Sequence, residues 1–332
     1  MANLKEEIKA IAKEKGIDKV GFTTKNCLQD APPSGDLSYV LANALSAISL
    51  LVAFDKTAIR KYLSKQDQME HTRDHRLAYI KLRDAATAIQ SLLREKGFEA
   101  DAPLPNFAYR KDQPFMAMAP PLSHRYVAVA SGLGWLGWSG NLVTPEYGAP
   151  VALTSVVTSA YLEPDPPIEG ESCKACHLCV ASCPSSFMSR SDEVSVKIAG
   201  RTYKYNRKAT NLRCNVTCGG ANGVRCPDAK WSTWSYKVLD LPGSGDDESF
   251  INKVLEYGKD PGNRRLRALI DVEKLDINGG DEFDRFVDRL LLTCCNCMLI
   301  CWPELKDRKE NYLLLTTSGR VVKSNNALTI VP

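Results

Sequence analysis

Residues 173–184 read Cys173-Lys174-Ala175-Cys176-His177-Leu178-Cys179-Val180-Ala181-Ser182-Cys183-Pro184. The cysteines are separated by two, two and three residues, and a proline follows the last of them, which is the spacing of cysteines that bind [4Fe–4S] cubanes. Cysteines two residues apart on a tight loop can bind adjacent irons of one cube, whereas the cysteine before the proline normally binds a second cube. The stretch therefore predicts two clusters and a second group of cysteines elsewhere in the chain.

A second group follows at residues 294–303, which read Cys-Cys-Asn-Cys-Met-Leu-Ile-Cys-Trp-Pro. The exchange of ligands seen in two-cluster proteins predicts one cube held by Cys173, Cys176, Cys179 and Cys301. It predicts a second cube held by Cys183, Cys294, Cys297 and one further residue. A zinc site usually pairs two Cys-x2-Cys knuckles and stops at four ligands, so the pattern favours clusters over zinc or disulfides.

The eighth ligand is not fixed by spacing. Four further cysteines could supply it: Cys214, Cys218, Cys226 and Cys295. Cys295 adjoins Cys294, and neighbouring residues rarely reach one cluster. We expect Cys214 to be the ligand, with Cys218 and Cys226 as alternatives and Cys27 as a structural cysteine.

The composition of the chain is that of a water-soluble globular protein. It has 332 residues, of which 44% are hydrophobic and 25% charged, and its net charge of +4 is too small to indicate nucleic-acid binding by itself. The 12 cysteines cluster in metal-ligand spacings, which indicates a reducing compartment rather than a disulfide scaffold. No signal-peptide core and no apolar run of membrane-spanning length is present, so we expect a cytoplasmic protein that does not enter a membrane.

Periodicity along the chain predicts a layered α+β fold in two parts. Helices are expected at residues 4–15, 38–46, 69–96 and 281–293, strands at 19–22, 47–53 and 151–162, and a β-hairpin at 195–205. Residues 163–167, Glu-Pro-Asp-Pro-Pro, read as a stiff linker. The predicted division is an α/β domain over 1–162 and a cluster domain over 163–332.

Residues 131–141, Ser-Gly-Leu-Gly-Trp-Leu-Gly-Trp-Ser-Gly-Asn, are unusually rich in glycine and tryptophan. Glycine allows close approach to a ligand and tryptophan offers a flat apolar face, so the segment suggests a site for a large flat cofactor. The residues predicted to contact it are Gly132, Gly134, Trp135, Gly137, Ser139 and Asn141. A dinucleotide fingerprint and a packed turn without ligand are alternatives, although the acidic residue that a fingerprint requires is missing.

Several stretches together resemble the cobalamin-dependent superfamily of epoxyqueuosine reductases and reductive dehalogenases. They are Leu4 to Thr24, Ala88 to Ala102, Ala119 to Leu122, Ala130 to Trp138, Asn141 to Gly148, Arg213-Cys214 and the two cysteine groups. The resemblance implies a nitroreductase-like domain that binds a base-off corrinoid, followed by a bacterial-ferredoxin-like domain with two [4Fe–4S] clusters. It implies an oxidoreductase in which electrons pass from the clusters to cobalt, with a ferredoxin- or flavodoxin-type protein as electron donor.

The chain departs from that family at the proton donor. Epoxyqueuosine reductases carry an aspartate before the Ala-Pro element, where this chain has Phe115-Met116-Ala117-Met118. Tyr126 and Tyr147 are the candidate donors, and Tyr109, His124 and Arg125 are less specific ones. The chain ends about thirty residues after Cys301, which leaves no room for the family's C-terminal helical repeats, so nucleic acid is not expected as a partner. We expect a reductase of a small organic substrate, such as a halide, or alternatively an electron-transfer or corrinoid-handling protein.

Overall fold

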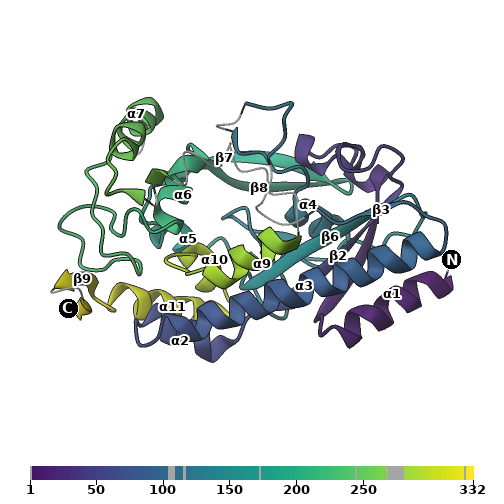
Figure 1. The fold of residues 1–332 in the computed structure, drawn as a ribbon, viewed down its shortest axis with the longest axis horizontal. Helices are drawn as coiled ribbons and strands as arrows, with labels where there is room; N and C mark the ends of the chain where they lie inside the picture. The colour runs from purple at the N-terminus through teal and green to yellow at the C-terminus, as the bar shows by residue number, and fades with distance from the viewer. Residues whose placement is uncertain are drawn as a thin grey trace.

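An antiparallel sheet and the helices on its two faces form one end of the molecule, and the cysteine-bearing segments form the other (Figure 1). The computed structural model describes residues 2–103, 109–114, 117–171, 173–243, 245–264, 266–267, 280–324 and 327–332. The mixture of helices and strands confirms the predicted α+β class. None of the described helices is long and apolar enough to span a membrane.

The sheet has the strand order β1-β2-β6-β3, and every neighbouring pair is antiparallel. Its strands are β1 (Lys19–Thr24), β2 (Ser46–Ala53), β3 (Ala100–Asp101) and β6 (Val151–Thr158). In β2 all residues but the last are buried, because helices cover both faces of the sheet. A strand covered on both faces forms a continuous apolar run, and for this reason residues 47–53 could be recognised from the sequence.

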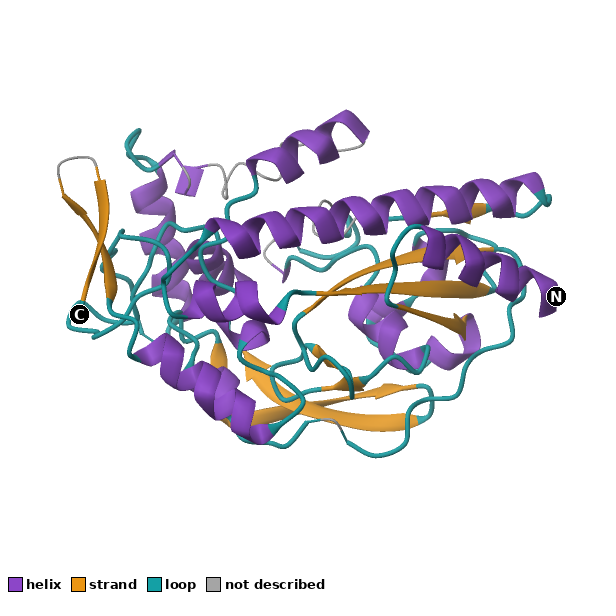
Figure 2. Ribbon diagram, turned by 90° about the horizontal axis from the view of Figure 1, so that it is seen from below, coloured by secondary structure: helices purple, strands orange, loops and turns teal. Residues whose placement is uncertain are grey.

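Two layers of helix cover the sheet. On one face lie α3 (Met69–Glu95) and, outside it, α1 (Ala2–Glu14); α3 spans the length of the sheet (Figures 1 and 2). The other face packs against α4 (His124–Ala130), whose first turn is capped by the Ser123 side chain. The helix α2 (Lys56–Leu63) follows β2 and is capped by Asp55, which accepts a hydrogen bond from the Ala58 amide at 2.7 Å.

The helix expected at residues 38–46 is absent. Only short 3-10 turns form in this region, the last at Leu37–Tyr39, after the earlier ones at Lys25–Leu28 and Pro33–Gly35. The Leu45 amide donates to the Thr158 carbonyl at 2.9 Å, so pairing with β6 begins directly before β2. The last residues of the expected helix therefore pair with the sheet and cannot be helical, so tertiary contacts override the local periodicity.

The second half of the chain is built from short elements. They are β4 (Trp135–Leu136), β5 (Leu142–Val143), α5 (Leu178–Ala181), β7 (Met188–Ile198), β8 (Arg201–Lys208), α6 (Asn211–Cys218), α7 (Asp247–Gly258), α9 (Gly280–Arg289), α10 (Asn296–Leu299), α11 (Leu305–Thr316), β9 (Arg320–Ser324) and β10 (Ala327–Val331). The expected hairpin around Ala199-Gly200 is present as β7 and β8, and its strands are longer than predicted. The terminal hairpin β9–β10 lies at the opposite end of the molecule from the N-terminus (Figure 2).

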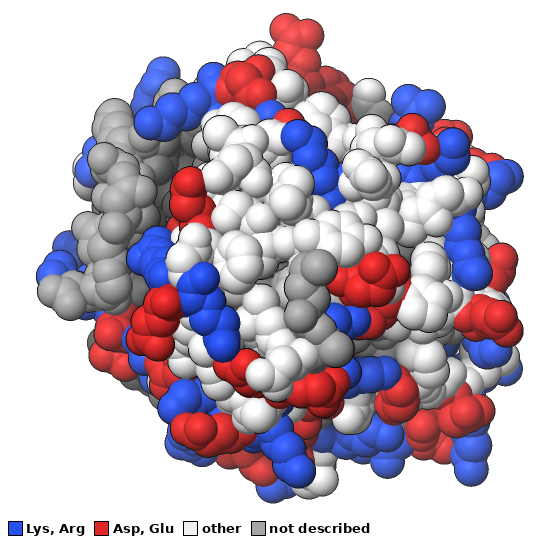
Figure 3. All heavy atoms as spheres, turned by 90° about the vertical axis from the view of Figure 1, so that its right-hand side faces the viewer, with Lys and Arg blue, Asp and Glu red and all other residues white. Residues whose placement is uncertain are grey.

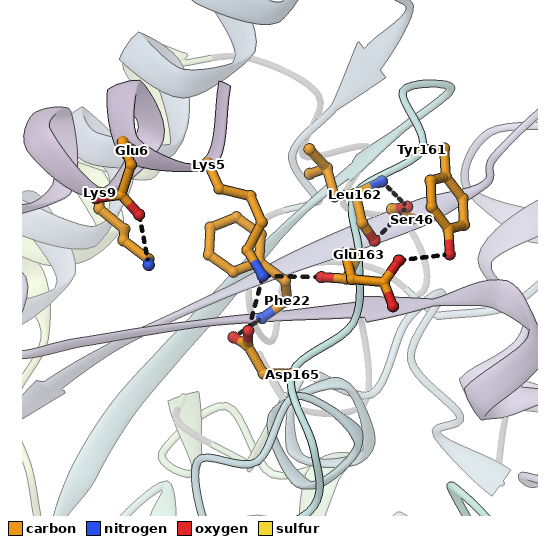
Figure 4. A network of polar contacts seen from close by, with 9 residues as sticks. All are labelled: Lys5, Glu6, Lys9, Phe22, Ser46, Tyr161, Leu162, Glu163 and Asp165. Carbon is orange, nitrogen blue, oxygen red and sulfur yellow. Dashed lines mark hydrogen bonds and ion pairs between the residues drawn. The ribbon is translucent and has the colours of Figure 1, made fainter. Parts of the chain in front are cut away.

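Residues 163–167, the predicted linker, form hydrogen bonds and an ion pair with the first half of the chain. Lys5 Nζ lies 2.8 Å from Asp165 Oδ1 and donates to the Glu163 carbonyl, while the Phe22 amide donates to Asp165 Oδ2 at 3.0 Å (Figure 4). Moreover, the buried core around β2 and α3 also includes Leu299 and Trp302 of the second half. The two halves therefore share one core, and the division at residue 162 stays a prediction.

Candidate iron–sulfur and cofactor site

The first cysteine group lies on a loop whose backbone is suited to an anionic cluster. Ala175 and His177 have φ of 45° and 54°, in the left-handed region, and the loop then enters the short helix α5. Alternation of left- and right-handed residues turns successive backbone N–H groups toward one side and makes an anion-binding concavity. The Trp138 amide also donates to Cys173 Sγ at 3.3 Å.

The second group repeats this geometry. Cys295 has φ of 72° and precedes α10, as His177 precedes α5, and the two short helices pack against each other. Each left-handed residue directly follows a cysteine, Cys176 in one group and Cys294 in the other. Cys295 therefore occupies the turn position of its loop, which gives a backbone reason why it is a poor candidate for the eighth ligand.

The structure brings together the four cysteines predicted for the first cube. One cavity is lined by Cys173, Cys176, Cys179 and Cys301, with Trp138, Ile300 and Arg308 among its other walls. Burial raises the pKa of the Cys179 thiol strongly and that of Cys301 to about 12, and the neighbouring cysteines of the same group add to both shifts.

The cysteines predicted for the second cube also gather, and two candidates for its fourth ligand lie with them. Cys183, Cys294 and Cys297 lie near α6, whose Cys214 and Cys218 place their sulfurs 3.6 Å apart. Cys214 is close enough to Cys183 and Cys297 to affect its pKa, and Cys218 hydrogen-bonds toward Cys294. Cys226 is exposed. The choice between Cys214 and Cys218 stays open in the geometry.

Among the described residues, no group of three or more His, Cys, Asp or Glu side chains is placed to hold one metal ion. The spacing of the cysteines along the chain is typical of [4Fe–4S] ligands, and the number of clusters stays a prediction.

Two cations, the half-buried Lys208 and the buried Arg308, accompany the cysteines, and sequence reasoning missed both. Lys208, on β8, donates to the Ser139 carbonyl, and burial lowers its pKa to about 8 although Cys297 and Cys179 act in the opposite direction. Arg308, on α11, is 1% exposed and lines the cavity of the first cysteine group. Positive charge beside thiolate-bound clusters stabilises their negative charge. Nothing in the sequence near either residue marks it for this position.

A second cavity, of about 260 Å³, lies between the sheet and the second cysteine group; we call it the central cavity. Its walls are His75 and Tyr79 of α3, Pro103, Pro120–Ser123, His124 and Arg125 of α4, Asn141 and Leu142, Ala149, Val151–Leu153 and Met298. Asn141 also donates its side-chain amide toward Cys297 Sγ at 3.8 Å. An apolar cavity with a few converging polar groups is the usual form of a cofactor or substrate site.

The residues predicted for the corrinoid are spread over three places. A Cβ at Gly134 or Gly137 would lie within 3 Å of atoms of Val143, and one at Gly132 would meet the Pro166 carbonyl, so these glycines approach the chain itself. Trp135 packs on Tyr203 with ring centres 4.5 Å apart, and Ser139 lines the first cluster cavity. Asn141 is the predicted residue that lines the central cavity. The assignment of the segment to a corrinoid stays a prediction.

Tyr126 and Tyr147, the main candidate proton donors, lie outside the walls of the central cavity, whereas the less specific candidates His124 and Arg125 line it. Tyr126 is partly buried beside Tyr205, and burial together with that neighbour raises its pKa strongly. Tyr147 lies in the turn between β5 and β6, where burial and the nearby Asp18 and Glu146 raise its pKa. The cavity is also lined by His75 and Tyr79, which sequence reasoning missed. The spacing of His71 and His75, one helical turn apart on α3, was the signal that could have found them.

A larger groove of about 830 Å³ lies between α2 and α11. Two of its cations are paired, Arg60 with Asp307 and Glu310, and Lys61 with Glu70, while Lys56 lies over the Trp302 ring. It is separate from the second cysteine group, and we therefore place the candidate site at the central cavity.

Comparison with known proteins identifies relatives by sequence and by fold. No family model matches the chain. An epoxyqueuosine reductase of Listeria monocytogenes is 30% identical over 218 residues, which cover 59% of this chain and 55% of that protein. A reductive dehalogenase, whose structure suggested a mechanism for B12-dependent dehalogenation, matches 98% of this chain and 39% of its own with a TM-score of 0.50 and 18% identity. The chain spans about half the length of the curated relatives it matches.

The comparisons also correct one expectation. A solved epoxyqueuosine reductase that holds an epoxyqueuosine-modified tRNA stem loop is among the structures similar to this chain, with 18% identity, coverage of 95% of this chain and 81% of that chain, and a TM-score of 0.44. The prediction that nucleic acid is an unlikely partner is wrong: it rested on chain length and on one absent carboxylate, whereas the curated proteins that match the chain by sequence are named epoxyqueuosine reductases. By sequence the chain is similar to epoxyqueuosine reductases, and by fold it is similar to a reductive dehalogenase.

Proposed function

We propose that this protein is a cobalamin- and iron–sulfur-dependent reductase that acts on an epoxide-bearing nucleoside in tRNA. The observation that carries the proposal is the contact between the central cavity and the second cysteine group. Asn141 lines the cavity and donates toward Cys297 Sγ, and Met298, next to Cys297, lines it as well. A cluster held there lies directly beside whatever the cavity binds.

Different residues of the chain would hold the clusters and the corrinoid in such a reductase. Cys183, Cys294 and Cys297 hold the cube beside the cavity, and the cysteines of the first group hold a cube farther from it. A corrinoid, when bound, supplies a strongly reducing metal centre, while the protein positions it and excludes water. The cavity lies just under the usual size of small-molecule pockets, so entry of a whole corrinoid requires outward movement of its walls at Pro120–Leu122.

A groove beside the second cysteine group supports a nucleic-acid substrate. The groove, of about 490 Å³, is lined by Cys183, Lys208 and three arginines, Arg190, Arg207 and Arg225, against two aspartates. Guanidinium groups bind phosphate in a bidentate fashion and suit a sugar–phosphate backbone. By contrast, the face in Figure 3 carries acidic and basic side chains interspersed around an uncharged area.

Anaerobic reconstitution with iron, sulfide and cobalamin tests the proposal. We expect enough iron for two cubanes per chain and the absorption spectrum of base-off cobalamin. With titanium(III) citrate as reductant, the protein should reduce the epoxide in an epoxyqueuosine-modified tRNA stem loop. The mass of the nucleoside released from the stem loop measures this reduction. The variant Cys297→Ser should lose turnover, whereas the matched Cys27→Ser should retain it. A cluster-loaded protein that neither binds cobalamin nor converts the stem loop refutes the proposal.

One observation favours a second candidate, an electron-transfer or corrinoid-handling protein. The described residues that line the central cavity include no carboxylate. A protein that binds and reduces a corrinoid without its own substrate needs no proton donor there. Cobalamin binding and reduction without conversion of the stem loop would support this alternative.

A further inference from the structure

Two histidines of α3 are buried without the hydrogen bonds that buried imidazoles normally make. His71 is 0% exposed, and neither of its ring nitrogens has a hydrogen-bond partner among the described residues; His75 is 7% exposed, and its Nδ1 has no such partner either. An unsatisfied buried polar group costs about 1–3 kcal/mol, so such groups are rare and usually serve a function.

Aromatic rings fix the position of the pair. Phe54 lies 4.6 Å from the His75 ring and 5.3 Å from the His71 ring, and Tyr79 meets His75 edge-on at 4.8 Å. His75 lines the central cavity, on the same wall as Tyr79 and together with His124 and Arg125 of α4. The unpartnered imidazole is therefore held rigidly at the place where a ligand binds.

The proposed reaction requires protons at this place. Two-electron reduction of an epoxide breaks a carbon–oxygen bond and consumes two electrons and two protons, whether the products are an alcohol or an alkene and water. The clusters supply the electrons. The described walls of the cavity carry no carboxylate, and the tyrosines expected to donate, Tyr126 and Tyr147, lie elsewhere.

We propose that His75 delivers a proton to the substrate bound in the central cavity, and that His71 and Asp74 connect it to solvent. This inference rests on the proposed function. The His71 and His75 ring centres are 6.0 Å apart, short enough for one bridging water, and His71 Nδ1 lies 3.7 Å from the Asp74 carboxylate. The Asp74 side chain is 23% exposed, so the path from His75 through His71 to Asp74 reaches the surface.

The surroundings of His75 favour an imidazole that passes a proton on over one that stays protonated and charged. Burial lowers the pKa of His75 to about 3, with His71 acting in the same direction and Asp74 in the opposite one. His75 is therefore neutral at neutral pH, and a neutral imidazole can release the proton on one nitrogen while it accepts another on the second.

The test compares single-turnover reduction of the epoxyqueuosine-modified tRNA stem loop by cluster- and cobalamin-loaded full chains. His75→Gln keeps a hydrogen-bonding side chain of similar reach but removes the relay, and we expect a loss of about 100-fold or more in rate with unchanged stem-loop affinity. Asp74→Asn should give a smaller loss. The matched variant Asp84→Asn, on the same helix and paired with Arg83, should be unaffected.

Two further readouts separate proton delivery from a packing role. Added imidazole should restore turnover to His75→Ala, and the solvent deuterium isotope effect should change in His75→Gln. A wild type that converts the stem loop, with His75→Gln within threefold of it, overturns the inference alone. A nitrogen splitting in the cob(II)alamin EPR spectrum that disappears in His75→Gln would make His75 a cobalt ligand and also overturn it. A wild type that binds cobalamin but leaves the stem loop unchanged refutes the proposed function, and the inference falls with it.

Discussion

At the scale of single residues, the two cysteine groups are copies of one backbone design. His177 and Cys295 occupy the same left-handed position after Cys176 and Cys294, and each leads into a short helix. We expect the residue at this position to turn the loop rather than to bind a cluster. The extra cysteine of the second group is explained by its place in the backbone, so the search for the eighth ligand moves to α6.

The eighth ligand can be identified by paired substitutions on α6. We expect Cys214→Ser to lose the second cube, because Cys214 lies close to both Cys183 and Cys297. Iron and acid-labile sulfide per chain should fall by about half, and Mössbauer spectra should show the remaining cube unchanged.

Cys218→Ser is the matched control, one helical turn away and 3.6 Å from Cys214 at the sulfurs. It should keep its iron. The opposite pattern, with iron lost from Cys218→Ser alone, would assign the ligand to Cys218.

His124 makes folding stability depend on pH. Burial lowers its pKa to about 4, and Arg125 adds to the shift, while its Nδ1 lies 3.0 Å from Ser155 Oγ. Because the unfolded chain binds a proton at about pH 6.5 and the folded chain does not, the free energy of unfolding falls as pH falls through this window.

The measurement is urea unfolding of the wild type and His124→Gln at about pH 7.5 and pH 5.5. The wild type should lose about 1 kcal/mol more than the variant, a figure reduced for the partial exposure of His124. Equal losses in the two proteins would show that His124 titrates normally in the folded state.

At the scale of elements, one glycine joins the sheet domain to the second cysteine group. Gly148 has φ of +74°, and a Cβ there would lie 2.7 Å from Trp302 Cα. Next to it, the Ala149 amide donates to the Cys301 carbonyl at 2.8 Å. The turn before β6 and the last cysteine of the second group are thus in direct backbone contact, which sets the position of Cys301 in the first cube.

Gly148→Ala should separate these segments. We expect a cost of about 2–4 kcal/mol, because overpacking against backbone adds to the strain of alanine at positive φ. Since Cys301 moves with the clash, the first cube should also be lost more quickly to a chelator. Thermal unfolding and the rate of iron release measure the two effects.

Gly97 is the matched control, because its φ is +84° and nothing lies within 4 Å of the position that a Cβ would take there. Gly97→Ala carries the conformational strain alone and should cost about 1 kcal/mol with normal iron release. If the two variants behave alike, the contact between Gly148 and Trp302 does not position Cys301.

The elements that the sequence predicted well are those whose periodicity reflects burial. The apolar run of β2 and the helical spacing of Ala85 and Ile89 in α3 both mark buried positions. Leu77, counted among the apolar helical positions of this stretch, is 50% exposed, because helical geometry turns it away from the buried face that carries Leu82 and Ile89. The helix expected at 38–46 failed because strand pairing, which local periodicity does not report, begins at Leu45.

For the site, the sequence predicted the ligands but little of the cavity. Cysteine spacing carries its own chemistry, so both groups could be paired without a structure. The walls of the central cavity come from α3, α4, β6 and α10, which lie far apart in the chain, so no single segment of the sequence predicts the cavity. No sequence motif marks His75 or Lys208. Each becomes a candidate functional residue only because folding places it beside groups from distant parts of the chain.

At the scale of the whole molecule, charge is distributed unevenly although the net charge is only +4. The groove beside Cys183 gathers Arg190 of β7, Arg207 of β8 and Arg225. The helix α1, with exposed Lys13, lies at the other end of the molecule from α6 and the cysteine-bearing helices (Figure 1). A polyanion is attracted to local fields rather than to net charge, so the groove is where a tRNA backbone should lie.

The double variant Arg190→Ala, Arg207→Ala tests this placement in the cluster-loaded protein. Each arginine that contacts a phosphate releases condensed counterions when RNA binds, so removal of two contacts should weaken stem-loop binding and reduce the slope of log affinity against log salt concentration by about 1–2. Fluorescence anisotropy of a labelled stem loop between about 50 and 200 mM salt measures both. Lys13→Ala removes a charge from α1 and should change neither. Because β7 and β8 carry no cluster ligand, iron content should be normal in both variants. An unchanged salt slope in the double variant would place the RNA on another face and leave the arginines beside the second cluster without a role in substrate binding.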